Sequence, residues 1–201
     1  GTSYKYNSSW HCWQRGGHGW LNITGAIEKS CNFFFYTIGT RMDIDVLAKY
    51  AKYFGLGVKT GVELPSEVAG SVASRETAEK NSHSWQPGDM MSAVIGQSYN
   101  AFTPLQMAKY ISMVATGGNK ITPTIVESVI RADGTEVPKE EVEQTIKAKL
   151  GITDDGTEDL TISQTSIDVV KEGMRSVTSD ESGTAYSVFK NFPIEVGGKT
   201  G

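Results

Sequence analysis

Hydrophobic positions recur at helical spacing over much of the first half of the chain. Between residues 43 and 54 the apolar residues fall at i, i+3, i+4 and i+7, one face of a helix, and Gly55 stands where a helix-ending glycine belongs. These residues are Leu47, Tyr50, Ala51 and Phe54. Upstream, the pattern predicts one helix that follows the N-cap Asn22 and runs to Ser30, and a second, buried helix over 33–42.

The helix beginning near residue 103 carries the most complete boundary signals. Thr103 is an N-cap residue, Pro104 suits the first helical position, and Gln106 completes a capping box. The pair Gly117-Gly118 ends the segment.

The pattern changes after residue 120. Residues 124–137 read as a short β-hairpin with Asp133-Gly134 at the turn. The charged, Gly/Asp-rich stretch 138–162 predicts a variable insertion or mobile loop, a helix follows over 164–178, and 194–201 read as a strand. The fold class predicted is α+β, with a mainly helical subdomain over 1–120 packed on a partial antiparallel sheet within 121–201.

Composition and charge exclude several classes of function. The chain has 201 residues, 38% of them hydrophobic and 21% charged, with a net charge of −4 and no run of basic residues. Nucleic acid and anionic membrane surfaces are therefore poor partners. No window approaches ~18 consecutive apolar residues, and the first ten residues lack the regions of a signal peptide.

Cysteines and histidines are too few to predict a metal site. Cys12 and Cys31 do not make a disulfide framework, so two reduced thiols are expected. Structural zinc takes four ligands at paired spacings, and the histidines are His11, His18 and His83. We expect no metal and no cofactor.

A Ser-x-Asn triplet at Ser30–Asn32 lies between two predicted helices. On a helix, positions i and i+2 lie about 200° apart and cannot face one site. At a break between helices the hydroxyl of Ser30 and the amide of Asn32 share a side, with Cys31 turned inward. An isolated triplet of this kind is more often a polar linker.

Lys-Thr-Gly occurs twice, at 59–61 and at 199–201. The first copy follows a helix end and precedes a proline, which indicates a loop. The second follows an apolar run and small glycines, which suits an anion-binding strand. A phosphate-binding loop is excluded, because position 193 holds proline where that motif needs glycine.

Together, Ser-x-Asn and the later Lys-Thr-Gly belong to the signature of penicillin-binding proteins and serine β-lactamases. The segments CWQRGGHGWLNITGAIEKSCNFFFY, FGLGVKTGVELPSEVAG, IGQSYNAFTPLQMAKYISMVATGG and SGTAYSVFKNFPIEVGGKTG stand in the order of that family. Nearly the whole chain thus resembles the transpeptidase domain of class B penicillin-binding proteins, closest to the penicillin-binding protein 2 type.

The resemblance implies a serine-type D,D-transpeptidase of peptidoglycan cross-linking, acting on the D-Ala-D-Ala stem peptide and acylated by β-lactams. It implies a parent anchored in the cell membrane with its catalytic domain outside, a SEDS-type glycosyltransferase as partner, and a fragment that is soluble by itself. Ser30 would relay a proton, Lys199 would supply positive charge, and Asn32 would bind the acyl amide. Thr200 would bind the substrate carboxylate, and Gly201 would keep the strand open to peptide.

The chain departs from the family pattern in one respect. Its one Ser-x-x-Lys, Ser187 to Lys190, follows Ser-x-Asn instead of preceding it, so the nucleophile and its lysine are absent. We therefore expect an excerpt of a longer enzyme that is inactive alone. A β-lactamase or a non-catalytic β-lactam-binding module on the same fold are the alternatives.

Overall fold

The structure, a computed structural model, describes residues 2–5, 8–151 and 160–201, with side chains from Trp10 onward. The chain forms two compact units, each discontinuous in sequence. The first unit comprises residues 1–47, 73–99 and 161–201, and the second comprises 48–72 and 100–160. In the described part of the chain, no helix is long and apolar enough to cross a membrane.

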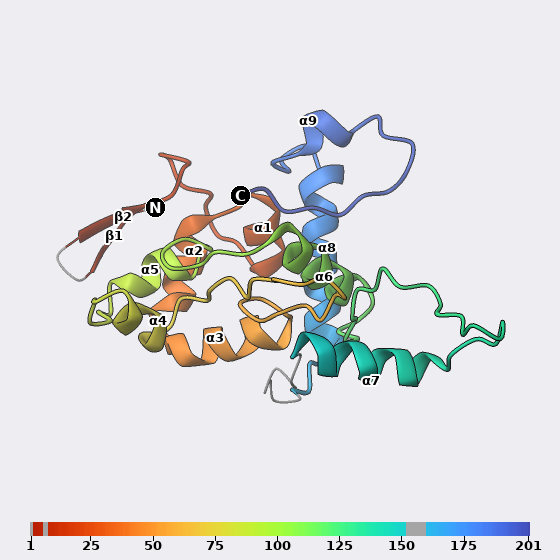
Figure 1. Ribbon diagram of the computed structural model, residues 1–201. Helices are drawn as coiled ribbons and strands as arrows, with labels where there is room; N and C mark the ends of the chain where they lie inside the picture. Colours follow the sequence, from red (N-terminus) through yellow and green to blue (C-terminus); the bar gives the residue numbers. More distant parts are fainter. Residues whose placement is uncertain (1, 6–7, 152–159) are drawn as a thin grey trace. The chain divides into compact units, whose positions relative to one another are not determined.

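The first unit is mainly helical (Figure 1). Its one described sheet is a two-stranded antiparallel hairpin in which Ser3 pairs with Trp10. This sheet lies at the N-terminus and not in 121–201, where the sequence placed it. The elements are β1 Thr2–Lys5, β2 Ser8–His11, α1 Ile23–Glu28, α2 Asn32–Gly39, α4 Arg75–Lys80, α5 Asp89–Ala93, α8 Gln164–Ser179 and α9 Tyr186–Phe189, with α3 Ile44–Tyr53 running from this unit into the second.

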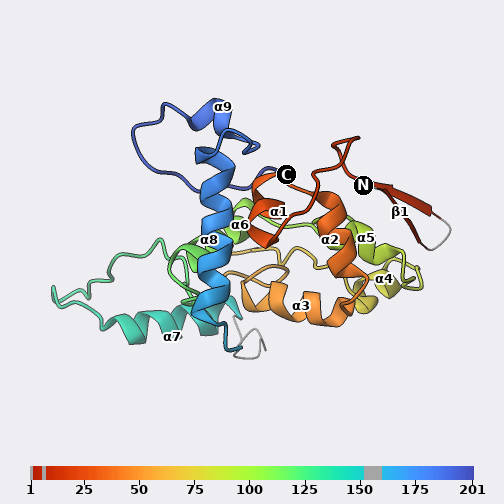
Figure 2. The ribbon, with the colours of Figure 1, turned by 180° about the vertical axis from the view of Figure 1, so that it is seen from behind.

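Helix α8 packs along α1, and both views of the ribbon show the two helices side by side (Figures 1 and 2). Gly173 permits this approach: a Cβ atom there would lie 2.9 Å from Cβ of Ile27, closer than real Cβ contacts allow. Ile27 is 7% exposed, and Val177 on the next turn of α8 is fully buried. The helix that ends just before Ser30 is therefore held by α8.

The predicted helices are confirmed at the positions given by their caps. Asn22 accepts a hydrogen bond from the amide of Gly25 and begins α1. Thr103 and Gln106 form the expected capping box on α6, Pro104–Ala115, in the second unit. The predicted helices over 43–54 and 164–178 are found as α3 and α8.

Gln106 also ties loops together within the second unit. Its side chain is fully buried, and its amide nitrogen donates to the carbonyl oxygens of Val58 at 2.6 Å and Ala69 at 2.7 Å. Its side-chain oxygen accepts from the amide of Thr103. Every polar atom of this side chain thus has a partner, as burial requires.

The prediction of a loop over 138–162 is wrong for its first half, because α7 occupies Lys139–Leu150. Acidic residues lie in the first turn of α7 and lysines in the last, which complements the helix dipole. Gly151 ends the helix in the left-handed conformation with φ 61°. The high density of charged residues suggested a loop, whereas their order, acidic residues first and lysines last, favours a helix. Residues 152–159 of the predicted loop lie outside the described part of the chain.

The predicted hairpin at 124–137 is present as a turn without named strands. An isolated bridge joins Ile130 and Glu136, and the amide of Arg131 donates to the carbonyl of Thr135. Gly134 has φ 85°, as a tight turn of this kind requires.

The C-terminal segment 194–201 is not a strand, contrary to the sequence prediction. A strand needs a neighbouring backbone for its N–H and C=O groups. Here Gly198 donates to the carbonyl of Met174 at 2.9 Å, and the carbonyl of Val196 accepts from the hydroxyl of Thr178, so α8 takes the place of a neighbouring strand.

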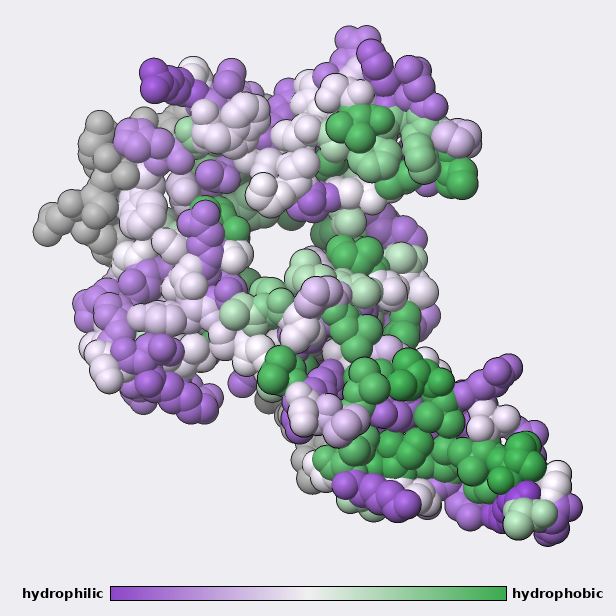
Figure 3. Space-filling model, turned by 45° about the horizontal axis from the view of Figure 1, so that its top comes forward, coloured by the Kyte–Doolittle hydropathy of each residue, from purple (hydrophilic) through white to green (hydrophobic). Residues whose placement is uncertain are grey.

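Hydrophobic side chains are left exposed on α9 and the residues after it (Figure 3). Val188 is 73% exposed, Phe192 53% and Ile194 68%.

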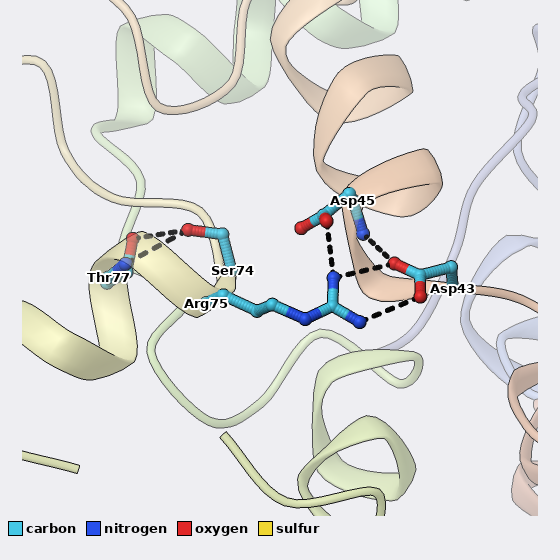
Figure 4. A network of polar contacts seen from close by, with 5 residues as sticks. All are labelled: Asp43, Asp45, Ser74, Arg75 and Thr77. Carbon is cyan, nitrogen blue, oxygen red and sulfur yellow. Dashed lines mark hydrogen bonds and ion pairs between the residues drawn. The ribbon is translucent and has the colours of Figure 1, made fainter. Parts of the chain in front are cut away.

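The start of α3 is tied to the start of α4 by charge (Figure 4). The guanidinium of Arg75 donates to both carboxylate oxygens of Asp43 at 2.8 Å and also contacts Asp45. Ser74 caps α4 by accepting from the amide of Thr77. The hydrogen bonds from Arg75 hold the pKa of Asp43 well below its usual range.

We expect Gly173→Ala to destabilise the first unit by about 1–3 kcal/mol, because the added methyl group forces α8 away from Ile27. The exposed neighbour in α8 provides a matched control, Glu172→Ala, which should change stability by less than ~0.5 kcal/mol. Urea denaturation of both variants measures the difference. Equal stability of the two variants would show that α1 and α8 are not in close contact.

The Asp43–Arg75 pair should make stability depend on acidity. The folded state binds the Asp43 proton more weakly than the unfolded state does. The contribution of the pair to folding stability is therefore complete above the unfolded pKa of about 4, and it is lost as the pH falls through the lower pKa of the folded state. Denaturation midpoints of the chain and of Asp43→Asn, measured from pH 5 downward, should converge. A constant difference between them would contradict this account.

Candidate active site

Ser30 occupies a strained turn at the end of α1. Its φ is 48°, in the left-handed region that side chains other than glycine rarely adopt. The amide of Ser30 donates to the carbonyl of Ile27 at 3.1 Å, and the amide of Cys31 donates to that of Ala26 at 2.9 Å. This is the Schellman pattern of helix ends, with serine at the position that glycine usually fills. A side chain at this φ costs roughly 1–2 kcal/mol. Ser82 ends α4 in the same way, at φ 57°, so the conformation alone does not mark a functional hydroxyl.

The residues after Ser30 behave largely as the sequence predicted. Ser30 and Cys31 lie between α1 and α2, and Cys31 is 5% exposed, packed with Cys12 and Ala26. Asn32 begins α2, and burial raises the pKa of Tyr36 on the next turn. That Asn32 and Ser30 face one side stays a prediction.

Lys199 reaches the turn from the other end of the chain. Its Nζ donates to Oγ of Ser30 at 2.7 Å, within the predicted reach, and also contacts the carbonyl of Thr200. Figures 1 and 2 both show the C-terminus beside α1. Desolvation of the ammonium group lowers the pKa of Lys199, although the residue as a whole is exposed, so its proton is released more readily than that of a free lysine.

A loop at 182–184 positions the C-terminal segment, and the sequence interpretation had not assigned it a role. Glu28, the buried last residue of α1, accepts from the hydroxyl of Ser182, and its carbonyl accepts from the amide of Thr184 at 3.3 Å. The hydroxyls of Thr184 and Thr200 are 2.8 Å apart. Gly183 fits because a Cβ there would lie 2.3 Å from the carbonyl oxygen of Ser176. The sequence offered one signal for the role of this loop: an acidic residue, Glu28, stands just before Ser-x-Asn at the end of an otherwise uncharged helix.

Two hydroxyls and one ammonium group therefore converge at this end of α1. They belong to Ser30, Thr200 and Lys199, and Thr184 adds a third hydroxyl beside Thr200. Such a set can bind a carboxylate and pass a proton between neighbouring oxygen and nitrogen atoms. A Cβ at Gly201 would meet no described atom, so the structure gives no steric reason for that glycine.

The first Lys-Thr-Gly copy is a structural loop of the second unit. Lys59 is exposed, while Thr60 is 2% exposed and its amide and hydroxyl both donate to the carboxylate of Glu67, at 2.7 and 2.6 Å. Gly61 has φ 87° and also donates to Glu67. The predicted exposed loop is confirmed for Lys59. Ser187 and Lys190, the misplaced Ser-x-x-Lys, are exposed at α9.

Three metal-ligating side chains lie together behind the turn, where the sequence predicted no metal site. The sulfur atoms of Cys12 and Cys31 and a ring nitrogen of His18 all lie within 4.8 Å of one another. Burial and the nearby charge of Lys29 lower the pKa of His18, which favours the neutral ring that a metal requires. Burial raises the pKa of the Cys31 thiol, and its neighbour Cys12 adds to the rise.

We predict that Ser30→Gly stabilises the chain, because glycine removes a strain of roughly 1–2 kcal/mol at this φ, reduced by about 1 kcal/mol for the lost hydrogen bond. Ser30→Ala is the matched control: it removes the hydroxyl but keeps the strain, and should destabilise. Thermal and urea unfolding measure both. A Ser30→Gly variant no more stable than Ser30→Ala would contradict the left-handed turn.

Comparison with known proteins shows the family of this chain. The family described as the penicillin binding protein transpeptidase domain matches residues 1–201. The chain is 32% identical over 190 residues to the peptidoglycan D,D-transpeptidase MrdA of Escherichia coli K12, covering 94% of this chain and 28% of that protein.

Solved structures agree with the sequence match. The penicillin-binding protein 2 of Pseudomonas aeruginosa, in complex with WCK 5153, superposes with a TM-score of 0.79 at 27% identity, covering 98% of this chain and 41% of that one. The protein of the same type from Helicobacter pylori, in complex with MreC, gives a TM-score of 0.76 at 26% identity, covering 100% and 34%. The predicted α+β fold class is thereby confirmed, and the chain spans less than half the length of these relatives. It belongs to the penicillin-binding protein transpeptidase domain family.

Proposed function

We propose that the protein to which this chain belongs is a serine-type peptidoglycan D,D-transpeptidase, with Ser30, Asn32 and Lys199 in its active site. The observation that carries the proposal is the hydrogen bond of 2.7 Å from Lys199 to Ser30, between residues 169 positions apart in the sequence. The MrdA relatives are named as D,D-transpeptidases.

The reaction divides into two acyl transfers. A serine oxygen, from the Ser-x-x-Lys that this chain lacks ahead of Ser30, attacks the carbonyl carbon of the penultimate D-Ala. The C–N bond then breaks, and the terminal D-Ala leaves as an amine once its nitrogen gains a proton. An acceptor amine from a neighbouring strand attacks the acyl-serine ester, loses a proton, and restores the serine hydroxyl.

Ser30 is suited to relay the first of these protons. Its hydroxyl accepts a hydrogen bond from Lys199, so its own proton is free to move toward a leaving nitrogen on its other side. The lowered pKa of Lys199 makes the ammonium a better proton source for Ser30 than an ordinary lysine would be. Its positive charge also stabilises negative charge developing nearby.

The substrate carboxylate would bind on the other side of Lys199. Thr200 offers a hydroxyl donor, held by the hydroxyl of Thr184 at 2.8 Å. The ammonium group of Lys199 lies next to it. Asn32 at the start of α2 would bind the acyl amide of the donor peptide, and Gly201 would leave room for its backbone.

Partners and location follow the relatives only as proposals. One solved relative is a complex with MreC, and another forms part of a peptidoglycan synthase complex that couples polymerization to crosslinking. We propose that the parent protein works outside the cytoplasmic membrane beside a SEDS-type glycosyltransferase. The peptidoglycan stem peptide is its substrate and β-lactams mimic the donor.

We predict that the 201-residue chain is not acylated by a labelled penicillin, and that a longer protein carrying Ser-x-x-Lys ahead of Gly1 is acylated once, at that serine. Removal of an acid–base group costs about 10²–10⁴ in rate, so Ser30→Ala and Lys199→Ala in the longer protein should slow acylation by that factor. Lys59→Ala, in the loop copy of the motif, is the matched control and should acylate at the parent rate.

Intact-mass spectrometry measures each adduct. An adduct on Ser30 or Ser187 of the 201-residue chain would refute the inference that the nucleophilic serine is absent from it. Fast release of the adduct by water instead of by an acceptor amine would favour a β-lactamase. Acylation without any transfer would favour a binding module.

A further inference from the structure

Glu28 is a buried carboxylate at the end of α1, and the reaction proposed above gives it no role. The residue is 9% exposed, and its carboxylate accepts from the hydroxyl of Ser182, which lies 154 positions further along the chain. An ionised carboxylate has only acceptor atoms, so a buried one needs donors of this kind. The bond joins the helix that ends at Ser30 to the loop between α8 and α9.

Backbone contacts to two helices hold this loop in place. The amide of Thr184 donates to the carbonyl of Glu28 in α1 at 3.3 Å, and the amide of Ala185 donates to the carbonyl of Val177 in α8 at 2.9 Å. Between them only glycine fits at position 183, because a Cβ there would lie 2.5 Å from the carbonyl oxygen of Val177. The hydroxyl of Thr184 is therefore fixed beside the C-terminal segment.

This hydroxyl has two acceptors within reach. The carbonyl oxygen of Glu28 lies 3.4 Å from it, whereas the hydroxyl oxygen of Thr200 lies 2.8 Å from it. A hydroxyl has one proton to donate, and the best O–H···O bonds are about 2.7–2.8 Å long. When Thr184 donates to Thr200, the proton of Thr200 points away from Thr184. The two hydroxyls then form a chain that ends in a donor, and the first bond polarises the second.

We propose that Glu28 is a positioning residue for the terminal carboxylate of the donor peptide. Through Ser182 it fixes the loop that carries Thr184, and Thr184 directs the proton of Thr200 toward the carboxylate. The site then favours a ligand with an ionised carboxylate over its ester, because a hydrogen bond to a charged acceptor is stronger. This inference rests on the proposed function and adds a specificity determinant to it.

Two ligands that differ only in the carboxylate test the proposal on the longer protein that carries Ser-x-x-Lys. They are benzylpenicillin and its methyl ester, and intact-mass spectrometry follows acylation by each. We define the acid preference as the ratio of the two acylation rates. Glu28→Ala and Thr184→Val should each lower the acid preference by about five- to tenfold, because each removes the hydrogen-bonded support of one donor.

Matched variants separate this effect from a loss of packing. Thr184→Val keeps the shape of the side chain and removes only the hydroxyl, and Thr184→Ser restores a hydroxyl and should recover the acid preference. Glu181→Ala removes an exposed acidic residue next to Ser182 and should keep the parent ratio. Ser182→Ala removes the bond to Glu28 from an exposed position, so it decides the question if Glu28→Ala does not fold.

An acid preference that stays at the parent value in Thr184→Val or Ser182→Ala would overturn the proposal, even if both rates fall together. Failure of the proposed function gives a different result: the unchanged longer protein would not be acylated, or would react equally with acid and ester. Amide hydrogen exchange in the 201-residue chain measures the positioning without any activity. Exchange at Thr184 and Ala185 should be faster in Glu28→Ala than in Glu181→Ala, and equal exchange would show that Glu28 does not hold the loop.

Discussion

The site depends on one turn, in which Ser30 adopts a left-handed backbone conformation at the end of α1. Two backbone hydrogen bonds, to the carbonyls of Ala26 and Ile27, close this turn, and Cys31 packs inward beneath it. The serine occupies a position where glycine would be more stable. The segments around the turn either fix its position or contact the Ser30 hydroxyl.

Elements distant in sequence hold the turn. Helix α8 packs on α1 at Gly173, and the buried carboxylate of Glu28 fixes the loop at 182–184, which in turn orients Thr200. The C-terminal segment then follows α8 through the hydrogen bond from Gly198 to Met174. Lys199 is brought to Ser30 by this path without any strand.

Local signals in the sequence predicted the helices and the break at Ser30. The caps Asn22 and Thr103 depend on residues three positions away, so they can be recognised in a single chain. The sequence analysis missed the charged helix α7 because it took the high polarity of the segment as a sign of a loop and did not use the order of its charges. The strand expected at 194–201 was wrong because strand formation depends on a neighbour that local sequence does not reveal.

Only part of the site could be predicted, because local sequence does not reveal which distant residues will be neighbours. Ser30, Asn32 and Lys199 stand out by motif, whereas Glu28 and Thr184 matter only through contacts over more than 150 positions. The grouping of Cys12, His18 and Cys31 likewise arises from the fold, since their spacing in sequence matches no zinc pattern.

The central claim is that Ser30 and Lys199 act as one unit. A double-mutant cycle on the rate of β-lactam acylation in the longer protein measures it most directly, through Ser30→Ala, Lys199→Ala and the pair. Groups that act together are non-additive, so the double variant should be about as slow as the slower single variant. Rate losses that simply multiply would contradict the claim, because they would mean that each residue acts without the other.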